Sequence, residues 1–175
     1  LSTRHLQQPD FATQLQTLLA RYPAIQPEWL ELEILETAAL DGIRQISQVI
    51  AACRQLGVRF AIDDFGTGYS SLMYLKHLSA QTLKIDRSFI GDLLLDPDDL
   101  AIVRGVIGLA AAFRLGVIAE GVSSMEQGIR LLELGCHQAQ GFVIARPMPA
   151  EEIPDWVRAW RNPEAWSLST LGSGN

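Results

Sequence analysis

The feature that most constrains the fold of this chain is a junction between a helix and a strand that occurs three times. In each copy, helically spaced apolar residues are followed by Leu-Gly and by a short run closed by Asp, Glu or Gln: RQLGVRFAID (54–63), FRLGVIAEG (113–121) and LELGCHQAQGF (132–142). A glycine directly after a helix readily takes the left-handed conformation that ends it. Gly57, Gly116 and Gly135 are therefore predicted to end three helices. Because strands and helices alternate, we expect parallel strands joined by helical crossovers.

The rest of the pattern predicts further elements in the same rhythm. Strands are expected near residues 29–35, 58–63, 82–86, 117–120 and 139–145, and helices near 10–21, 38–56, 70–77, 97–115, 124–134 and 149–161. Asp96 and Pro97 predict the start of one helix, and Ser123 with Glu126 predicts a capping box at the start of another. Residues 162–175 are expected to form a poorly ordered tail.

Side chains that can do chemistry follow the carboxyl ends of all the predicted strands: Glu33 and Glu36, Asp63 and Asp64, Lys84 and Asp86, Glu120, and Gln140. In a (β/α)8 barrel the active site is built at that face, from the ends of several strands. Adjacent side chains in a regular strand point to opposite faces. We expect this alternation to relax where the strand near 58–63 ends and the glycine loop begins, so that Asp63 and Asp64 both turn toward the rim. The predicted fold class is α/β, a (β/α)8 TIM barrel with about five of its eight strands in this chain and three expected before residue 1.

Composition restricts the classes of function. The chain has 175 residues and a net charge of −6, so binding to DNA or RNA polymers is a poor fit. An anionic ligand would instead need divalent metal to neutralise it. No apolar run approaches the roughly 20 residues that cross a bilayer, and no secretion leader is visible. Cys53 and Cys136 form no CxxC pair and are expected to be buried thiols of a reducing compartment. The segment is therefore expected in the cytoplasm, and without a spanning run it is expected to make no membrane contact.

Several motifs in order carry a resemblance to a known family. They are LELEILE (30–36), DDFGTGYSSL (63–72), LKID (83–86), IAEGV (118–122), QGF (140–142) and ARPMP (145–149). The chain resembles the EAL family of bacterial phosphodiesterases, which linearise cyclic di-GMP. The resemblance covers residues 1–161 and implies a modified TIM barrel that hydrolyses cyclic di-GMP to linear pGpG.

The resemblance also implies a pair of Mg²⁺ or Mn²⁺ ions held by carboxylates. Glu33 and Asp63 would bind the first ion, together with a family glutamate and asparagine that lie on earlier strands and are not in this sequence. Asp63 would bridge to the second ion, which Asp64 contacts and near which Glu120 lies. Hard carboxylate oxygens suit these ions, and two ions can stabilise both the attacking and the leaving oxygen of a phosphodiester.

Further roles carry over by motif position. Lys84 would hold or polarise the attacking water, and Gln140 would orient that water or a ligating carboxylate. Glu36 would steady the glycine loop that follows the two aspartates, formed by Gly66, Thr67 and Gly68.

Other interpretations of the same residues stay open. Asp63 and Asp64 could be a turn acid and a helix cap, and Glu33 could be an ion-pair partner. Asp86 is expected to be a cap, and Trp156 and Trp160 are expected to pack together. The competing functions are an inactive EAL domain that binds cyclic di-GMP or a protein partner, and an aldolase-like barrel that uses Lys84 as a Schiff-base amine.

The resemblance implies partners besides the substrate. Sensor or GGDEF domains often accompany the family and its members commonly pair. Upstream domains and a homodimer are therefore expected partners, and a membrane tether would come only from such upstream domains.

Overall fold

The computed structural model describes residues 1–36, 43–68, 75 and 77–166. It contains one parallel five-stranded sheet in which the spatial order equals the chain order. The strands are β1 (Glu31–Leu35), β2 (Arg59–Phe65), β3 (Thr82–Ile85), β4 (Gly116–Ala119) and β5 (Gln138–Ala139). Unbroken sequential order of parallel strands is the arrangement of a (β/α) barrel wall, which confirms the predicted fold class.

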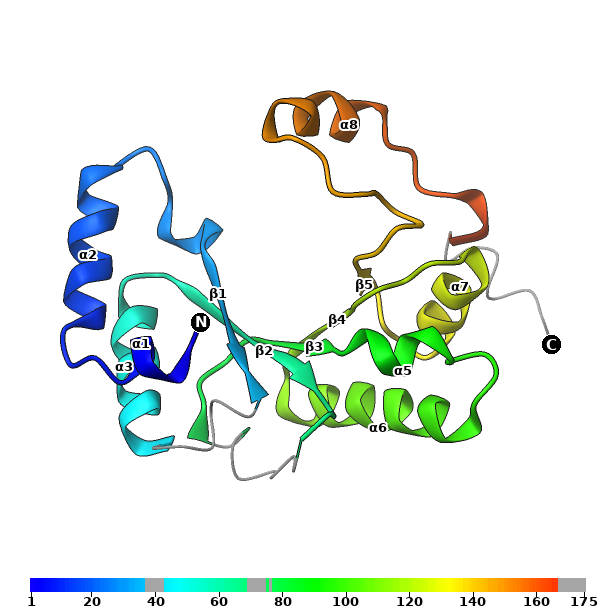
Figure 1. Ribbon diagram of the computed structural model, residues 1–175, viewed down its shortest axis with the longest axis horizontal. Coiled ribbons are helices and arrows are strands. Elements are labelled where there is room, and N and C mark those ends of the chain that lie inside the picture. The colour runs from blue at the N-terminus through cyan, green and yellow to red at the C-terminus, as the bar shows by residue number, and fades with distance from the viewer. Residues whose placement is uncertain (37–42, 69–74, 76, 167–175) are drawn as a thin grey trace.

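Helices connect successive strands, two more precede the first strand, and the last α-helix stands away from the sheet (Figure 1). The first half carries α1 (Thr3–Leu6), α2 (Phe11–Arg21), the 3-10 turn η1 (Pro27–Trp29) and α3 (Ile43–Gln55). The second half carries α5 (Arg87–Gly91), α6 (Pro97–Phe113), α7 (Met125–Glu133), η3 (Ala150–Glu152), α8 (Ile153–Ala159) and η4 (Glu164–Trp166). No helix in these described parts is both long and apolar enough to pass through a bilayer.

The core lies between the sheet and the helices that cover it. All four residues of β3 are buried, and Phe60 on β2 is fully buried. Helix α3 supplies Ile46 and Ile50, and α6 supplies Val103, all fully buried. Each such side chain contributes roughly 1.5–3 kcal/mol through burial, so the apolar runs of the central strands hold the sheet in place.

Local signals place most helix ends correctly. Gly57 and Gly135 have φ of +96° and +90°, which confirms the predicted left-handed ends. The Asp96 side chain accepts a hydrogen bond of 2.8 Å from Asp98 N, with Pro97 in the first turn, as predicted for the start of α6.

Three predicted helix features were wrong. Gly116 is the first residue of β4, and Arg114 (φ +58°) takes the left-handed position that ends α6 two residues earlier. The capping box of α7 uses Ser124 with Gln127, because the helix begins one residue later than predicted. The helix predicted over 149–161 is η3 followed by α8, which ends at Ala159.

All five strands differ from their predicted bounds, and the differences in β2 and β5 bear on the site. β2 continues to Phe65, two residues beyond the predicted end. The strand predicted over 139–145 ends at Ala139, because the chain turns at Gly141, whose carbonyl accepts hydrogen bonds from Ile144 N and Ala145 N at 3.0 Å.

The C-terminal segment packs on α7 as far as it is described. The Trp166 indole N–H donates to Met125 O at 3.1 Å, and its ring fills the space beside Gly128, where an added Cβ would lie 2.5 Å from ring atoms. Trp156 and Trp160 pack together as predicted, with ring centroids 5.1 Å apart. The predicted tail beyond residue 166, most of the helix near 70–77 and the first residues of the helix near 38–56 lie outside the described residues.

Candidate active site

The two adjacent aspartates reach one side of the sheet because β2 contains a bulge. Ile62 pairs with Leu83 and Phe65 pairs with Ile85, so three steps along β2 match two steps along β3. Asp64 is the second-last residue of β2 and has φ of +54°. Aspartate tolerates this left-handed conformation better than most residues. The alternation of side chains is thereby broken inside the strand, not beyond its end.

Three carboxylates converge at the carboxyl ends of β2 and β4. One oxygen from each of Asp63, Asp64 and Glu120 lies within 4.8 Å of the other two. Ligand oxygens on opposite sides of a hard divalent cation lie roughly 4–5 Å apart, since each metal–oxygen bond is about 2.0–2.6 Å. The donor set therefore fits a hard divalent ion. Glu33 on β1 lies outside this group of three and joins the site through Lys84.

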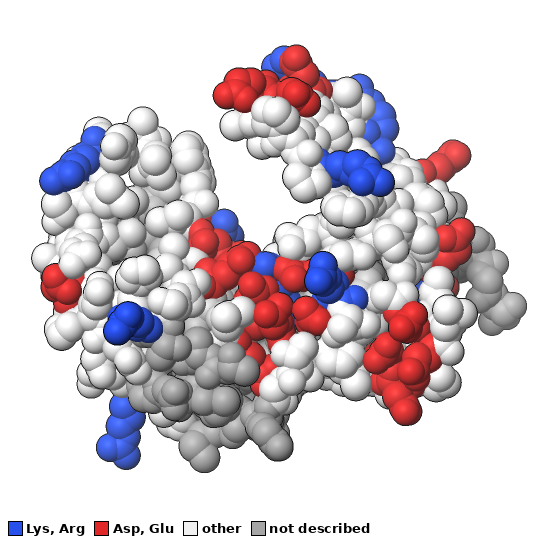
Figure 2. All heavy atoms as spheres, viewed as in Figure 1, with Lys and Arg blue, Asp and Glu red and all other residues white. Residues whose placement is uncertain are grey.

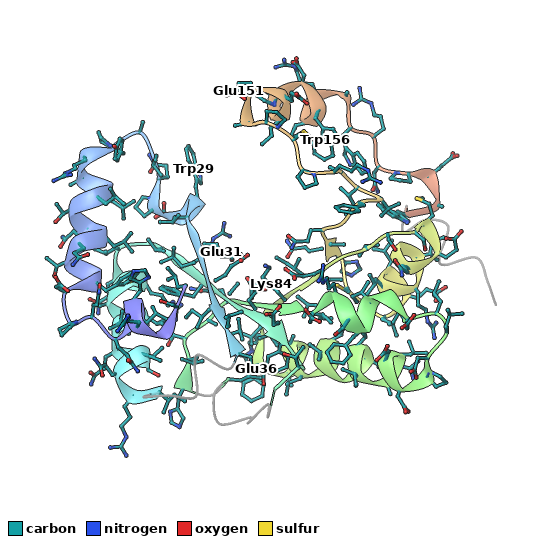
Figure 3. The ribbon with its side chains drawn as sticks, viewed as in Figure 1. Trp29, Glu31, Glu36, Lys84, Glu151 and Trp156 are labelled. Carbon is teal, nitrogen blue, oxygen red and sulfur yellow. The ribbon has the colours of Figure 1, made fainter. Side chains whose placement is uncertain are left out.

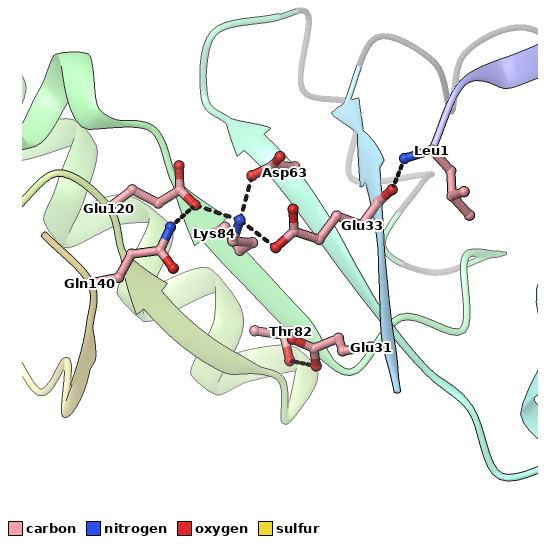
Figure 4. Close-up of polar contacts among 8 residues, drawn as sticks. All are labelled: Leu1, Glu31, Glu33, Asp63, Thr82, Lys84, Glu120 and Gln140. Carbon is pink, nitrogen blue, oxygen red and sulfur yellow. Dashed lines mark hydrogen bonds and ion pairs between the residues drawn. The ribbon is translucent and has the colours of Figure 1, made fainter. Parts of the chain in front are cut away.

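We call the four carboxylates at these strand ends the acid cluster: Glu33, Asp63, Asp64 and Glu120. Lys84 lies among them, and Figure 4 shows its contacts with three of the four. Its Nζ atom is 2.6 Å from Glu33 Oε1, 3.0 Å from Asp63 Oδ1 and 2.5 Å from Glu120 Oε1. Figure 3 shows Lys84 near the middle of the molecule, projecting from β3. Only 5% of its side chain is exposed. One ammonium thus joins carboxylates from the three strands β1, β2 and β4.

These contacts set the charge state of Lys84. Burial lowers the pKa of the Lys84 amine, but hydrogen bonds to Glu120, Glu33 and Asp63 outweigh burial and hold the pKa above its usual range. An amine that stays protonated near neutral pH is a poor nucleophile toward a carbonyl carbon. The site therefore disfavours the Schiff-base interpretation of Lys84.

The acids retain part of their mutual repulsion. Burial raises the pKa of the Glu120 carboxyl and outweighs the lowering effect of Lys84. Burial also raises the pKa of the Asp64 carboxyl, and the charge of Asp63 and the side chain of Asp86 add to the shift. A single ammonium does not neutralise this group, so a cation placed among the acids would relieve the repulsion.

Gln140 directly follows β5 and makes a hydrogen bond to the Glu120 carboxylate. Its Nε2 donates to Glu120 Oε1 at 2.7 Å, the same oxygen that contacts Lys84. Both contacts use Oε1 and fix the orientation of the carboxylate, while its second oxygen accepts no hydrogen bond from the described residues. That oxygen is the one available to a ligand.

Glu36 lies under the glycine loop that follows the aspartates. This side chain is 3% exposed, and its Oε2 accepts a hydrogen bond of 2.9 Å from Gly66 N. A Cβ on Gly68 would lie 3.1 Å from Glu36 Oε1, so the loop approaches the carboxylate closely. Thr67 Oγ1 donates to Asp64 O at 2.8 Å and closes the turn. The geometry ties the loop to the residue that directly follows β1.

A cleft of about 700 Å³ opens beside Glu120 and Gln140. Its lining includes Arg87 and Arg146, and the Arg146 guanidinium carbon lies 4.8 Å from the centre of the Phe142 ring. Figure 2 shows acidic side chains in the middle of this face with basic ones next to them. Phe142 and Arg146 belong to the QGF and ARPMP motifs, but no role was predicted for either side chain from the sequence. Their position after β5 was the available signal, and Arg87 follows β3 in the same way.

Asp86 caps α5, as predicted, by accepting a hydrogen bond of 2.9 Å from Ser88 N. Its carboxyl group also interacts with the side chain of Asp64. Hydrogen bonds from Ser88 outweigh burial and hold the pKa of the Asp86 carboxyl below its usual value. The cap is therefore an ionised acid at the edge of the cluster.

Fold and acid cluster together define this chain as part of a (β/α)-barrel protein with a candidate centre for a hard divalent cation at its strand ends. The family model described as "EAL domain" matches residues 1–147. The chain belongs to the EAL domain family, as its motifs predicted.

Relatives in the family include named enzymes and solved structures. The bifunctional diguanylate cyclase/cyclic di-GMP phosphodiesterase MucR of Pseudomonas aeruginosa is 45% identical over 130 residues, which cover 74% of this chain and 19% of MucR. The structure titled "PaMucR Phosphodiesterase, c-di-GMP complex" matches with a TM-score of 0.82 and 40% identity, covering 87% of this chain and 62% of that one. The chain thus spans about a fifth of the length of the curated relatives it matches.

Two further solved structures extend the comparison. The EAL domain of Mycobacterium smegmatis DcpA matches with a TM-score of 0.86 and 38% identity, covering 93% of this chain and 73% of that one. The manganese and cyclic di-GMP complex of Klebsiella pneumoniae BlrP1 matches with a TM-score of 0.73 and 32% identity, covering 79% and 35%. EAL domains are thus found with divalent metal, and the acid cluster gives this chain a matching donor set.

Proposed function

We propose that this EAL domain hydrolyses one phosphodiester bond of cyclic di-GMP and releases linear pGpG. The observation that carries the proposal is the convergence of Asp63, Asp64 and Glu120 within 4.8 Å, beside the buried ammonium of Lys84. The relative MucR, named as a cyclic di-GMP phosphodiesterase, supports the choice of substrate.

The metal would be held by Asp63, Asp64 and Glu120, with Glu33 contributing from β1. Their hard oxygen donors suit Mg²⁺ or Mn²⁺. When bound, two such ions supply an activated water and neutralise charge on the phosphate oxygens. Water oxygen then bonds to phosphorus, the P–O3′ bond breaks, and the leaving 3′ oxygen takes a proton. The product keeps a 5′ phosphate and gains a 3′ hydroxyl, which is pGpG.

The chain's own residues then orient and stabilise the reacting groups. The Lys84 ammonium lies among the acids and would offset charge that builds on the phosphate in the transition state. Gln140 holds Glu120 in one orientation through the 2.7 Å hydrogen bond. The glycine loop, held by Glu36 through Gly66 N, would keep the two aspartates in place.

The cleft beside Glu120 supplies the chemistry that a cyclic dinucleotide needs. Arg87 and Arg146 offer positive charge for phosphate, and the Phe142 ring, 61% exposed, offers a face for a purine base. Hydrophobic contact and charge are thus available next to the proposed metal ligands.

Upstream sensor or GGDEF domains, a homodimer and a cytoplasmic location also belong to this proposal. The much greater length of the curated relatives supports additional domains. Light scattering of the intact protein would measure the dimer, and a monomer at micromolar concentration would refute that part.

The experiment is turnover of cyclic di-GMP by the intact protein with Mg²⁺ or Mn²⁺, followed by chromatography for pGpG. Product should form with metal and disappear when EDTA is in excess. Binding of cyclic di-GMP that leaves the ligand whole in the presence of metal would replace the enzymatic proposal with a receptor function.

A further inference from the structure

Gln127 is a buried amide, outside the acid cluster, that uses both ends of its side chain. It lies on α7 and is 5% exposed. Its Oε1 accepts hydrogen bonds from Ser123 N at 2.8 Å, Ser123 Oγ at 3.1 Å and Ser124 N at 3.2 Å. Its Nε2 donates to Ile90 O at 2.9 Å and Gly91 O at 3.1 Å. One side chain therefore joins the loop after β4 to the end of α5.

The oxygen end of Gln127 holds the loop that begins at Glu120. Ser123 is three residues after this acid, and the intervening Val122 N donates to Gln140 O at 3.1 Å. Gln140 in turn binds the Glu120 carboxylate at 2.7 Å. Movement of Ser123 would therefore be transmitted to the carboxylate and to the amide that orients it.

The nitrogen end of Gln127 holds α5, which packs against Gly66 after the two aspartates and against Gly121 after Glu120. A Cβ on Gly66, next to the aspartates, would lie 3.0 Å from the Phe89 ring. A Cβ on Gly121, next to Glu120, would lie 2.6 Å from Arg87 Cβ. The first turn of α5 is thus in close contact with the segments that carry the acids of β2 and β4.

A helix as short as α5 cannot hold its position alone. It has five residues, and isolated helices shorter than about 12 residues are marginal in water. The last carbonyls of any helix also lack partners within the helix. The Gln127 amide supplies two donors to these carbonyls, so the position of α5 depends on a residue of α7.

We propose that Gln127 is a positioning residue for the acid cluster. By tying α5 to the loop after β4, it fixes the separation between Glu120 and the Asp63–Asp64 pair. The part of this inference that concerns metal affinity rests on the proposed function, whereas the tie between α5 and the loop does not.

The competing explanation is that Gln127 only caps α7. Two substitutions separate the roles. Ser124→Ala removes the hydroxyl that accepts from Gln127 N at 3.2 Å, so the cap is lost and the amide donors to α5 remain. Gln127→Glu keeps the acceptor that a capping box needs, but an ionised carboxylate has no donor for the two carbonyls. Gln127→Met removes every hydrogen bond of the side chain, keeps the backbone donor to Ser124 Oγ and serves as the full side-chain deletion.

Hydrogen exchange measured by mass spectrometry and Mn²⁺ binding measured by calorimetry test the proposal. Gln127→Glu and Gln127→Met should speed exchange in segments 87–91 and 120–124 by at least about 10-fold and weaken Mn²⁺ binding by about 10-fold, the scale of outer-shell changes at metal sites. Ser124→Ala should speed exchange in the first turn of α7 and leave the other segments and Mn²⁺ affinity at wild-type values. Wild-type exchange at 87–91 and wild-type Mn²⁺ affinity in both Gln127 variants would overturn the inference.

A measurement on the unaltered protein covers the case in which the Gln127 variants do not fold. In native-state exchange with increasing denaturant, segments 87–91 and 120–124 should open together as one unit. Opening of α5 at clearly lower denaturant than the loop would refute the tie. Failure of the unaltered protein to cleave cyclic di-GMP would refute the proposed function and would not change this exchange result.

Discussion

Replacing Lys84 with methionine is expected to release the repulsion among the acids at the rim. The ammonium lies 2.5–3.0 Å from carboxylate oxygens of Glu33, Asp63 and Glu120, and methionine has similar length but no charge. Removing one partner of a buried ion pair costs roughly 3–5 kcal/mol. Glu33 is 47% exposed and therefore screened by water, whereas Asp63 and Glu120 are 20% and 15% exposed.

We therefore expect the free energy of unfolding to fall by about 3 kcal/mol in Lys84→Met, near the lower end of that range. For a chain of this size, this corresponds to a drop of about 6–12 °C in Tm. Thermal unfolding followed by circular dichroism in EDTA measures the loss. Excess Mn²⁺ should raise the Tm of the variant more than that of the wild type, because the uncompensated acids bind cations more tightly.

Arg130→Met is the matched control. It breaks an exposed ion pair with Glu133 of 2.8 Å, in which the side chains are 33% and 43% exposed. Exposed pairs contribute at most about 1 kcal/mol, so the Tm should change little and should not depend on Mn²⁺. Equal Tm values for Lys84→Met and wild type in EDTA would refute the view that the ammonium holds the acid cluster together.

Three other substitutions give distinct outcomes. Asp63→Asn should reduce cyclic di-GMP turnover by at least about 10³-fold with little change in Tm, and wild-type rates would exclude a metal-ligand role. Asp64→Asn should raise the Tm in EDTA at pH 7 and lose this advantage near pH 3. The pKa of Asp64 is raised in the folded state, so the folded state holds the proton more tightly than the unfolded state does. The ionised carboxylate therefore destabilises the fold as the pH rises. A Tm in EDTA at or below the wild-type value at pH 7 would contradict this sign. Gly66→Ala should lower the free energy of unfolding by about 1–3 kcal/mol, because φ is +103° and the new Cβ would lie 3.0 Å from the Phe89 ring. An unchanged denaturation midpoint would contradict this expected loss of stability.

The sequence predicts the positions of the strand-end side chains well because parallel topology supplies the geometry. Once Glu33, Asp63, Lys84 and Glu120 are placed at the carboxyl ends of successive parallel strands, they must share one edge of the sheet. The helix-to-strand junctions are local and therefore legible, as Gly57 shows with φ of +96°. The same rule failed at Gly116, because Arg114 adopts the left-handed conformation first.

Two parts of the site depend on contacts that no local pattern contains. The apolar run 142–145 looks like the continuation of a strand, but its backbone hydrogen bonds close a turn at Gly141 instead. Gln127 bonds to carbonyls 36 and 37 residues earlier in the chain, so its place beside α5 follows only from the folded arrangement. The sequence predicted a capping residue in this region but one position too early.

The bulge in β2 explains why adjacent aspartates stand where a buried strand ends. A regular strand would send Asp64 to the opposite face from Asp63, and the left-handed conformation of Asp64 (φ +54°) prevents this. The arrangement carries backbone strain of the order of 1–3 kcal/mol and leaves like charges close together. Neither feature helps folding, since burial and the neighbouring acid both raise the pKa of Asp64. A strand end that keeps both the strain and the repulsion is therefore organised for a cation. The residues around it, Glu36 and Gln127 among them, hold together like charges that would otherwise separate.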